Sequence, residues 1–175
     1  MHDTKVKLAG DIERHTLTVL VDNEAGVLAR VVGLFSGRGY NIESLTVAEV
    51  DAMARTSRIT IVTSGTPAVI EQIETQLRRL VPTHKVTNWT SAKAGIEREM
   101  ALVKVAGTGE KRVEALRMAD AFRARPVDTT QASFVFEITG APSKIDSFVD
   151  LMRPLGLVEI SRTGVAAISR GPDAM

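Results

Sequence analysis

The chain has 175 residues, of which 44% are hydrophobic and 25% are charged, as is typical of a soluble globular protein with one domain of ordinary size or two small ones. Its 22 basic and 21 acidic side chains nearly cancel, and only 4% of the residues are aromatic, so the composition argues against a surface that binds nucleic acid. The sequence contains no cysteine, which excludes disulfides, thiolate metal sites and cysteine nucleophiles.

The beginning of the chain is polar. We interpret residues 1–14 as a polar N-terminal arm, because they lack the apolar core of a secretory signal. No run in the sequence approaches the roughly 18 apolar residues that a membrane-spanning helix needs. We therefore expect a cytoplasmic protein that does not contact a membrane.

Alternating and helical hydrophobic patterns follow one another in the first half. Leu17 and Val19 alternate with threonines, which predicts a half-buried strand, whereas from Val27 onward apolar residues recur at three- and four-residue intervals, which predicts a helix. Thr66 and Pro67 have the residue types preferred at the N-cap and at the first helical position, so a second helix begins there. The expected elements are strand 15–21, helix 27–37, strand 40–50, strand 57–64, helix 67–81 and strand 84–91.

The second half can be read in the same way. The expected elements are strand 98–107, helix 109–125 ended by Pro126, strand 133–139, helix 141–156 and one or two short strands within 157–169. The buried side of the first of these helices is expected to carry Val113, Leu116, Ala119 and Phe122. Ser143 and Asp146 have the spacing of a capping box at the start of the second helix.

The order of elements predicts the fold class. The order β-α-β-β-α-β over residues 15–91 is that of a ferredoxin-like module, in which two helices cover one face of a four-stranded antiparallel sheet. Residues 92–96 are small and polar enough to form a linker, and residues 97–175 can be interpreted as a second module of the same kind. The predicted fold is therefore α+β, with two tandem ferredoxin-like (βαββαβ) modules.

Groups of residues typical of catalysis are scarce. No two of the three histidines, His2, His15 and His84, have the i, i+4 spacing of a helical metal site, and the last two fit ordinary positions at strand ends. The serines lie in no G-x-S-x-G turn. We expect no catalytic residue, no metal site and no cofactor in this chain.

Three further features allow a binding role beside a structural one, and the structural interpretation is favoured for each. The stretch GTGEKR at residues 107–112 fits a glycine turn into a helix, or an anion site at the helix N-terminus. The helix that follows is basic, so it has either a solvated face or a docking surface for an acidic partner. Trp89 either packs in the interior or stacks on a ligand.

The turn between the first strand and the first helix contains Asn23 and Gly26. Free backbone N–H groups at a helix N-terminus stabilise a carboxylate, and a glycine lets a ligand approach the backbone closely. The Asn23 amide can donate to a carboxylate and accept from an ammonium group, so the turn suits the charged end of an amino acid. An apolar slot for a small branched side chain would be lined by Val27, Leu28 and Ile42. The structural alternative is that Asn23 caps the helix and Gly26 eases its start.

The chain closely resembles the regulatory, small subunit of acetolactate synthase, also called acetohydroxyacid synthase, in the stretch NEAGVLARVVGLFSGRGYNIESLTV of residues 23–47. The resemblance continues through SRITIV, EQIETQLRRLV, EREMALVKV, SRTG and ISRG, and so covers nearly the whole chain. It implies that residues 15–91 form an ACT domain and that residues 97–175 form the family's second, ferredoxin-like domain. Only the stretch RPVDTTQASF, residues 125–134, departs more from that second domain.

The resemblance also implies a function. Such chains are non-catalytic subunits of a thiamine-diphosphate-dependent transferase in branched-chain amino-acid biosynthesis. They bind the catalytic (large) subunit, raise its activity and confer feedback inhibition by a branched-chain amino acid, typically valine, with leucine and isoleucine as further candidates. The catalytic partner is expected to use thiamine diphosphate, Mg²⁺ and FAD. The alternative function is a stand-alone amino-acid-sensing ACT protein that regulates a different enzyme.

The resemblance assigns roles to particular residues. Asn23 and Gly26 match the family's effector-binding loop, and Asn41 matches the asparagine that reaches the site from the neighbouring protomer. ACT domains usually pair side by side into a continuous sheet, so the family implies a homodimer with effector sites at the seam.

Overall fold

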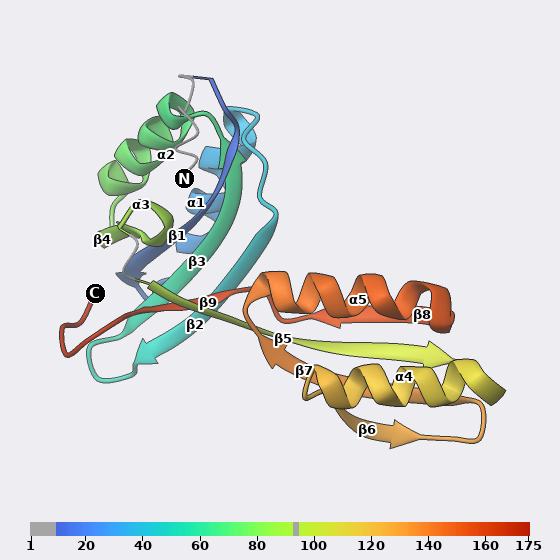
Figure 1. The fold of residues 1–175 in the computed structure, drawn as a ribbon. Helices are drawn as coiled ribbons and strands as arrows, with labels where there is room; N and C mark the ends of the chain where they lie inside the picture. The colour runs from blue at the N-terminus through green and yellow to red at the C-terminus, as the bar shows by residue number, and fades with distance from the viewer. Residues whose placement is uncertain (1–9, 93–94) are drawn as a thin grey trace. The chain divides into compact units, whose positions relative to one another are not determined.

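The computed structural model describes residues 10–92 and 95–175, and the chain divides into two compact units. The first unit comprises the residues up to Ile96 together with Ala167–Met175, and the second comprises Glu97–Ala166. Both units combine helices with an antiparallel sheet, so the predicted α+β class is confirmed (Figure 1).

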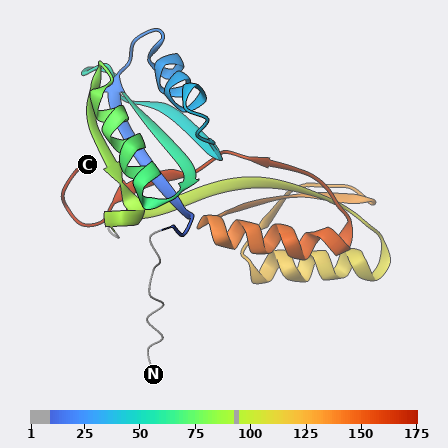
Figure 2. The same cartoon turned by 90° about the horizontal axis from the view of Figure 1, so that it is seen from above.

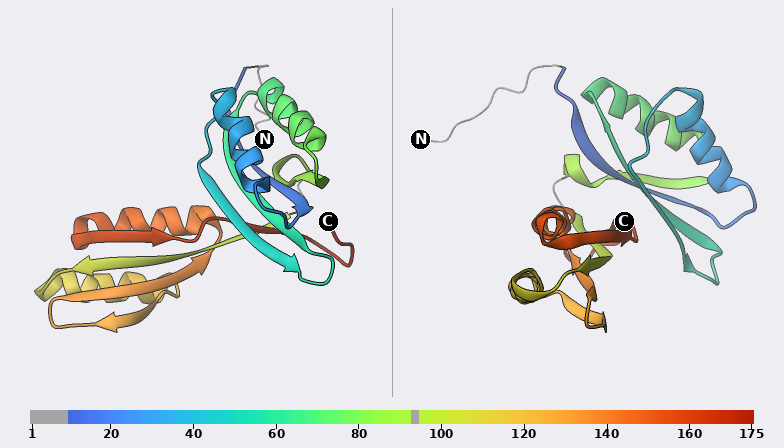
Figure 3. Two further views of the ribbon diagram at one scale, coloured as in Figure 1. Left: turned by 180° about the vertical axis from the view of Figure 1, so that it is seen from behind. Right: turned by 90° about the vertical axis from the view of Figure 1, so that its right-hand side faces the viewer.

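The first unit is built on a four-stranded sheet with the strand order β2-β3-β1-β4. Its antiparallel strands are β1 (Glu13–Asp22), β2 (Ser44–Asp51), β3 (Thr56–Gly65) and β4 (Thr83–Asn88). The two long helices, α1 (Val27–Gly37) and α2 (Pro67–Arg79), lie on the same face of this sheet, as the view from behind shows (Figure 3). This is the ferredoxin-like arrangement that the order of elements predicts.

The core of the first unit lies between the helices and the sheet. Leu17 and Val19 on β1, and Ile59 and Ile61 on β3, are at most 1% exposed. They face the helices because alternate side chains of a strand point to the same side. The two helices contribute Val27, Val31, Leu34, Phe35, Ile70, Ile73 and Leu77 to the same core.

The helix ends of the first unit follow local signals. The Thr66 hydroxyl accepts a hydrogen bond from the backbone N–H of Val69, and Pro67 occupies the first helical position, as predicted. Helix α1 ends at Gly37, and Gly39 follows with a φ of +69°. A glycine takes this left-handed conformation at little cost, and the chain can therefore leave the helix there.

The expected strand 84–91 is wrong at its end. Strand β4 stops at Asn88, and Trp89–Ala92 form the short helix α3. The Asn88 side chain accounts for the change, because its Oδ1 accepts a hydrogen bond from the N–H of Ser91 at 3.1 Å. Such a bond stabilises a helical turn in preference to an extended chain.

Strand β2 is shorter than expected and lies at the edge of the sheet. It begins at Ser44, although the pattern predicted a strand over 40–50. Leu45 packs against the core, but Val47 and Val50 are 43% and 51% exposed. Only the beginning of β2 therefore reaches the core, and Val47 and Val50 present apolar side chains at the edge of the sheet.

The second unit has the same connectivity as the first. Its sheet has the order β6-β7-β5-β8, and β9 (Ala166–Ser169) also pairs with β5. Its strands are β5 (Gly95–Ala106), β6 (Arg125–Thr129), β7 (Ser133–Gly140) and β8 (Leu157–Arg162). Helices α4 (Gly109–Ala121) and α5 (Pro142–Gly156) lie side by side on one face of it (Figure 2).

The core of the second unit follows the predicted alternation. The buried strand residues are Ala101, Val103, Val105, Phe134, Phe136 and Ile138. On α5, Ile145, Phe148, Val149 and Met152 recur at the i, i+3, i+4 and i+7 spacing of one helix face, and all four are at most 5% exposed. The expected boundaries differ from the observed units in two places: β5 begins at Gly95, inside the expected linker 92–96, and residues 167–175 group with the first unit. Parts of the expected linker and of the N-terminal arm 1–14 lie outside the described residues.

Helix α4 differs from the expected helix 109–125: it ends at Ala121, and a different face of it is buried. Val113 and Leu116, expected inside, are 57% and 39% exposed. Ala119 is 1% exposed, as expected, and Ala115, which was not expected inside, is also 1% exposed. Small side chains on the inner face let a helix lie close to its neighbours. The alanines therefore face the core, and the larger Val113 and Leu116 face outward.

Two expected element ends in the second unit are also wrong. Pro126 does not end the helix but lies in the edge strand β6, where the missing N–H costs little; the chain has already turned at Arg123, whose φ is +56°. Ser143 does not cap α5, because the helix begins at Pro142 with Ala141 as N-cap and no capping side chain. Proline presets the backbone for the first helical position, so the helix starts before the serine.

A buried ion pair joins three elements of the second unit. Arg162, at the end of β8, donates Nε and Nη2 to the two carboxylate oxygens of Glu99 on β5 at 2.8 and 2.6 Å. Its Nη1 donates to Asp146 on α5 at 2.7 Å. Glu99 is only 5% exposed, and its hydrogen bond raises the pKa of Arg162 above the usual value, so the guanidinium stays charged.

Substituting Arg162→Met leaves the buried Glu99 carboxylate without its cation. We expect the free energy of unfolding to fall by about 3 kcal/mol, measured by urea denaturation of the full chain with far-ultraviolet circular dichroism. The control is Arg153→Met, which removes an exposed ion pair with Asp150 and is expected to cost less than about 1 kcal/mol. Equal losses in the two variants would show that Glu99 does not depend on Arg162.

Candidate functional site

The turn between β1 and α1 is held on two sides by backbone hydrogen bonds. The N–H of Asn23 donates to the carbonyl of Arg55, in the β2–β3 turn, at 2.6 Å. The N–H of Asp22 donates to the carbonyl of Pro82, just before β4, at 3.2 Å, and the Asp22 carboxylate pairs with His84 at 2.6 Å. The turn is therefore fixed by two other parts of the first unit.

The first turn of α1 has backbone donors without a capping side chain. Gly26 is the N-cap with a φ of +86°, and no side-chain hydrogen bond caps the helix. The structural alternative, in which the Asn23 side chain caps α1, is therefore wrong. The helical bonds begin with Arg30 N–H to Gly26 O at 3.0 Å, and the N–H of Val27 donates to the carbonyl of Glu24 at 3.4 Å. Among the described residues, the N–H groups of Leu28 and Ala29 therefore remain without a backbone acceptor. The first turn also contains no acidic residue, and its amides and the helix dipole favour an anion there.

The side chains predicted around this turn differ in exposure. Asn23 is exposed, and among the described residues its side chain has no hydrogen-bond partner. Leu28 is 41% exposed, whereas Val27 is 5% exposed and belongs to the core, and Ile42 is half-buried against the same core. A single chain thus presents polar groups and Leu28 at the turn, but Val27 faces inward.

Asn41 lies beyond the other end of α1. The helix has 11 residues, which at 1.5 Å per residue separates its two ends by about 16 Å. The Asn23–Gly26 turn precedes the helix and Asn41 follows it. One chain therefore does not bring these predicted site residues together, and a site that contains both needs two chains.

The remaining polar candidates have structural partners. His15 is 7% exposed and lies 3.1 Å from the side-chain nitrogen of Asn88. Trp89 is 5% exposed and donates its Nε1–H to the Thr18 hydroxyl at 2.7 Å, so it is a packing residue. His2 lies outside the described residues. Over residues 10–92 and 95–175 there is no cluster of His, Asp and Glu suited to a metal ion, and no helix long and apolar enough to cross a membrane.

The start of α4 shows a contact that the sequence analysis missed. The Arg112 guanidinium lies 3.9 Å from the centre of the Phe134 ring, a cation–π contact that fixes one of the predicted basic residues against the unit. A hollow of about 810 Å³ lies along the exposed side of α4, lined by residues that include Lys111, Glu114 and Leu155. Its lining mixes both signs of charge, so it does not favour an acidic partner over a basic one.

Arg55 was also missed by sequence reasoning. Its carbonyl anchors the Asn23 N–H, and its φ is +49°, a left-handed conformation that few residues other than glycine adopt. The gap between the expected strands 40–50 and 57–64 implied a turn at this place, but the residue types there do not show which carbonyl bonds to the β1–α1 turn.

Models of known protein families match both units. A model described as the AHAS small subunit-like ACT domain matches residues 17–85. A second model, described as the small subunit of acetolactate synthase, matches residues 98–171.

Curated proteins and a solved structure match nearly the whole chain. A probable acetolactate synthase small subunit from Archaeoglobus fulgidus is 47% identical over 158 residues, which cover 90% of this chain and 98% of that protein. The small subunit of acetolactate synthase isozyme 3 from Escherichia coli is 44% identical over 163 residues, or 93% of this chain and 99% of that one. The crystal structure of the small subunit from Thermotoga maritima superposes with a TM-score of 0.79 at 38% identity, covering 92% of this chain and 99% of that chain.

The left-handed N-cap of α1 predicts a specific cost of substitution. A Cβ added at Gly26 would meet no atom within 4 Å, but it would strain the backbone at a φ of +86°. Gly26→Ala should therefore lower the free energy of unfolding by about 1 kcal/mol. Gly37→Ala, at the other end of α1 and equally open, should instead be neutral or stabilising. The measurement is urea denaturation followed by the fluorescence of Trp89. A loss in both variants would contradict the assignment of strain to Gly26.

Proposed function

This chain belongs to the family of acetolactate synthase small subunits, and we propose that it is the regulatory subunit of that enzyme. In this role it has no active site of its own, binds the catalytic subunit and raises its activity. It also confers feedback inhibition by a branched-chain amino acid, which we propose to be valine, and it acts in the cytoplasm. The names of its relatives support the catalytic subunit of acetolactate synthase as the partner, since each relative is named as a small subunit of that enzyme.

The main support for the proposed effector site is that no side chain caps the first turn of α1. Its Leu28 and Ala29 N–H groups are available to a carboxylate, and Gly26 places no side chain between them and a ligand. The exposed Asn23 amide offers a carbonyl to an ammonium group and an NH₂ to a carboxylate. Together these groups suit the charged end of a free amino acid.

A second copy of the chain would complete this site. The Asn41 side chain is exposed and lies about one helix length from the turn of its own chain, so it is available to a neighbouring protomer. In the proposed dimer, each ligand lies between the Asn23–Leu28 loop of one protomer and the Asn41–Ile42 segment of its partner. Leu28 and Ile42 would then face the ligand's branched side chain.

The edge of the first sheet supports such a dimer. β2 is an edge strand of 8 residues, and Val47 and Val50 are exposed along it. An edge of this kind is ready to pair with another strand. Pairing two β2 strands about a two-fold axis would join the sheets of two first units and cover these valines.

The proposed inhibition follows from linkage. A ligand that touches two protomers favours the arrangement in which both contacts form, and it can shift the catalytic subunit only by binding one arrangement more tightly than another. Such couplings are typically of about 1–3 kcal/mol, and the catalytic subunit must alter effector affinity by the same factor. We assign thiamine diphosphate, Mg²⁺ and FAD to the catalytic partner and none of them to this chain.

Gly26→Asp tests the effector loop. A carboxylate at this position would repel the carboxylate of the effector, so we expect loss of valine inhibition with activation retained. The measurement is acetolactate formation by the reconstituted catalytic subunit, with and without valine, leucine and isoleucine. Gly37→Asp adds the same charge at the far end of α1 and should keep inhibition.

The outcomes of this reconstitution separate the possible errors. A Gly26→Asp complex that stays fully sensitive to valine shows that the loop is not the effector site. A wild-type chain that binds an amino acid but neither binds nor activates the catalytic subunit is a stand-alone sensor, and the proposed regulatory role is then wrong.

Val47→Glu tests the proposed seam. Two copies of the new carboxylate would lie close together across a β2–β2 pairing, so we expect the substitution to shift the full chain from dimer toward monomer in sedimentation velocity. Val158→Glu, at a 60% exposed valine on the outer strand β8 of the second sheet, is the matched control and should leave the dimer unchanged. A Val47→Glu chain that remains dimeric places the interface elsewhere.

A further inference from the structure

The segment Tyr40–Glu43, between α1 and β2, is tied to the first unit along its length. The N–H of Tyr40 donates to the carbonyl of Phe35 at 3.0 Å, and the two rings meet edge to face at 6.2 Å. The Tyr40 hydroxyl donates to the side chain of Gln72 on α2 at 3.1 Å. The N-terminal end of the segment is therefore held against both helices.

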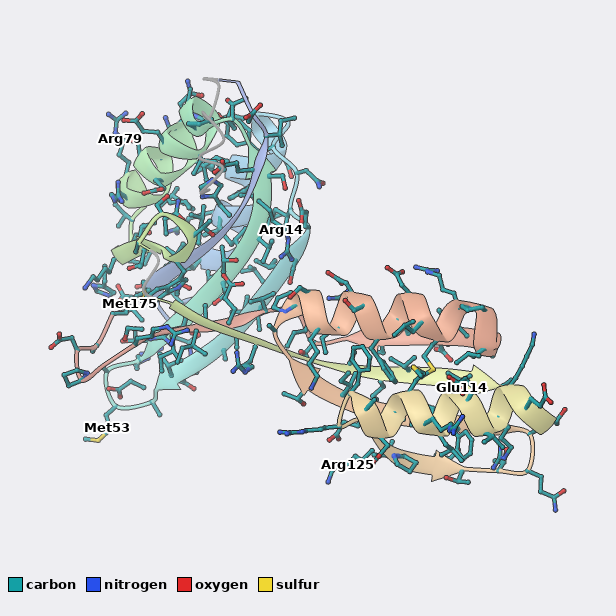
Figure 4. All side chains as sticks on the ribbon, in the orientation of Figure 1. Arg14, Met53, Arg79, Glu114, Arg125 and Met175 are labelled. Atoms are coloured by element: carbon teal, nitrogen blue, oxygen red, sulfur yellow. The ribbon has the colours of Figure 1, made fainter. Side chains whose placement is uncertain are left out.

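Glu43 fixes the other end of the segment. Its N–H donates to the carbonyl of Val62 on β3 at 2.8 Å. Its carboxylate accepts from the Ser64 hydroxyl and, at 3.0 Å, from Nε of Arg14, which Figure 4 labels on β1. Two strands thus hold this side chain, and the chain cannot shift here without losing three hydrogen bonds.

Between these ends, a buried hydroxyl holds the backbone of Asn41. The Thr63 side chain on β3 is 0% exposed, and its Oγ1 donates to the carbonyl oxygen of Asn41 at 2.6 Å. Leaving that buried hydroxyl without a partner would cost free energy, so the bond restrains both residues. Thr63 shares the helix-facing side of β3 with Ile59 and Ile61, since all three have the same parity along the strand.

Unlike its backbone, the side chain of Asn41 is not held by other groups in the part of the chain that the structure describes. It is exposed, and among the described residues no group hydrogen-bonds its amide. Because the backbone is already fixed, only the rotamer freedom of the side chain is lost when Asn41 binds a ligand. The fixed backbone and unbonded side chain of Asn41 suit a residue that contacts a ligand better than one that stabilises the fold.

From these contacts we propose that Thr63 is a positioning residue for the effector site. Its hydroxyl holds the Asn41 backbone against the sheet and so keeps the Asn41 amide available to a ligand bound in the partner's loop. The inference rests on the proposed function, but it adds a residue that lies in the core and does not touch the ligand. Effector affinity would then depend on a hydrogen bond inside one protomer.

The test uses valine binding to the full-length chain by isothermal titration calorimetry. Thr63→Val keeps the shape of the side chain and removes the donor, and we expect valine affinity to fall about three- to tenfold. Thr63→Ser retains a hydroxyl and should restore most of the affinity. Thr60→Val is the matched control: Thr60 lies on the same strand, is 3% exposed, and its hydroxyl meets Thr18 at 3.4 Å on the opposite face.

A double-mutant cycle separates positioning from general destabilisation. If Thr63 acts through Asn41, Thr63→Val should change affinity by less than about twofold once Asn41→Ala is present. In the ligand-free chain, amide exchange of residues 40–43 should be faster in Thr63→Val than in Thr60→Val. Equal losses with and without the Asn41 side chain, or unchanged affinity in Thr63→Val, would overturn the inference.

The same experiment distinguishes failure of the inference from failure of the proposed function. If Asn41→Ala weakens valine binding and Thr63→Val does not, the effector site stands and only the positioning role is wrong. If Asn41→Ala has no effect, or the wild-type chain binds no branched-chain amino acid, the proposed site is wrong and the inference falls with it.

Discussion

The backbone N–H groups of Leu28 and Ala29, in the first turn of α1, are the feature on which the proposed regulation depends. A helix N-terminus without a capping side chain keeps unsatisfied donors and the positive end of the helix dipole. Here the N-cap is a left-handed Gly26, so neither a side chain nor a Cβ competes with a ligand. The turn is also fixed by the carbonyls of Arg55 and Pro82, so an effector would meet donors that are already ordered.

Helix α1 separates the two halves of the proposed site. Its first turn carries the donors, and the segment after its last turn carries Asn41. Because the helix is rigid and about 16 Å long, the separation cannot be closed within one protomer. A site that forms only between two copies makes occupancy sensitive to their mutual arrangement, and this sensitivity is what a regulatory subunit needs. The contacts of Thr63 and Glu43 fix one half of that site within each copy.

The two units show how one connectivity serves different packing. In the first, α1 and α2 contribute large apolar residues to the core. In the second, α4 contributes alanines, while Val113 and Leu116 face outward, and the ion pair of Glu99 and Arg162 joins β5 to β8. The fold therefore depends on the order of elements and on the alternation of the strands, whereas the choice of buried helix face depends on the neighbours available.

The sequence by itself determined the strands with alternating patterns, the order of elements from β1 to β4 and the start of α2 after Thr66, because these follow from signals within a few residues. It did not predict the short helix α3 or the edge strand β6. It also placed a glycine and an asparagine in the β1–α1 turn. Only the tertiary structure decided which face of α4 is buried, that the turn is anchored by Arg55, and that Thr63 holds Asn41. These depend on groups brought together from distant parts of the chain, and hydrophobic periodicity carries no information about such partners.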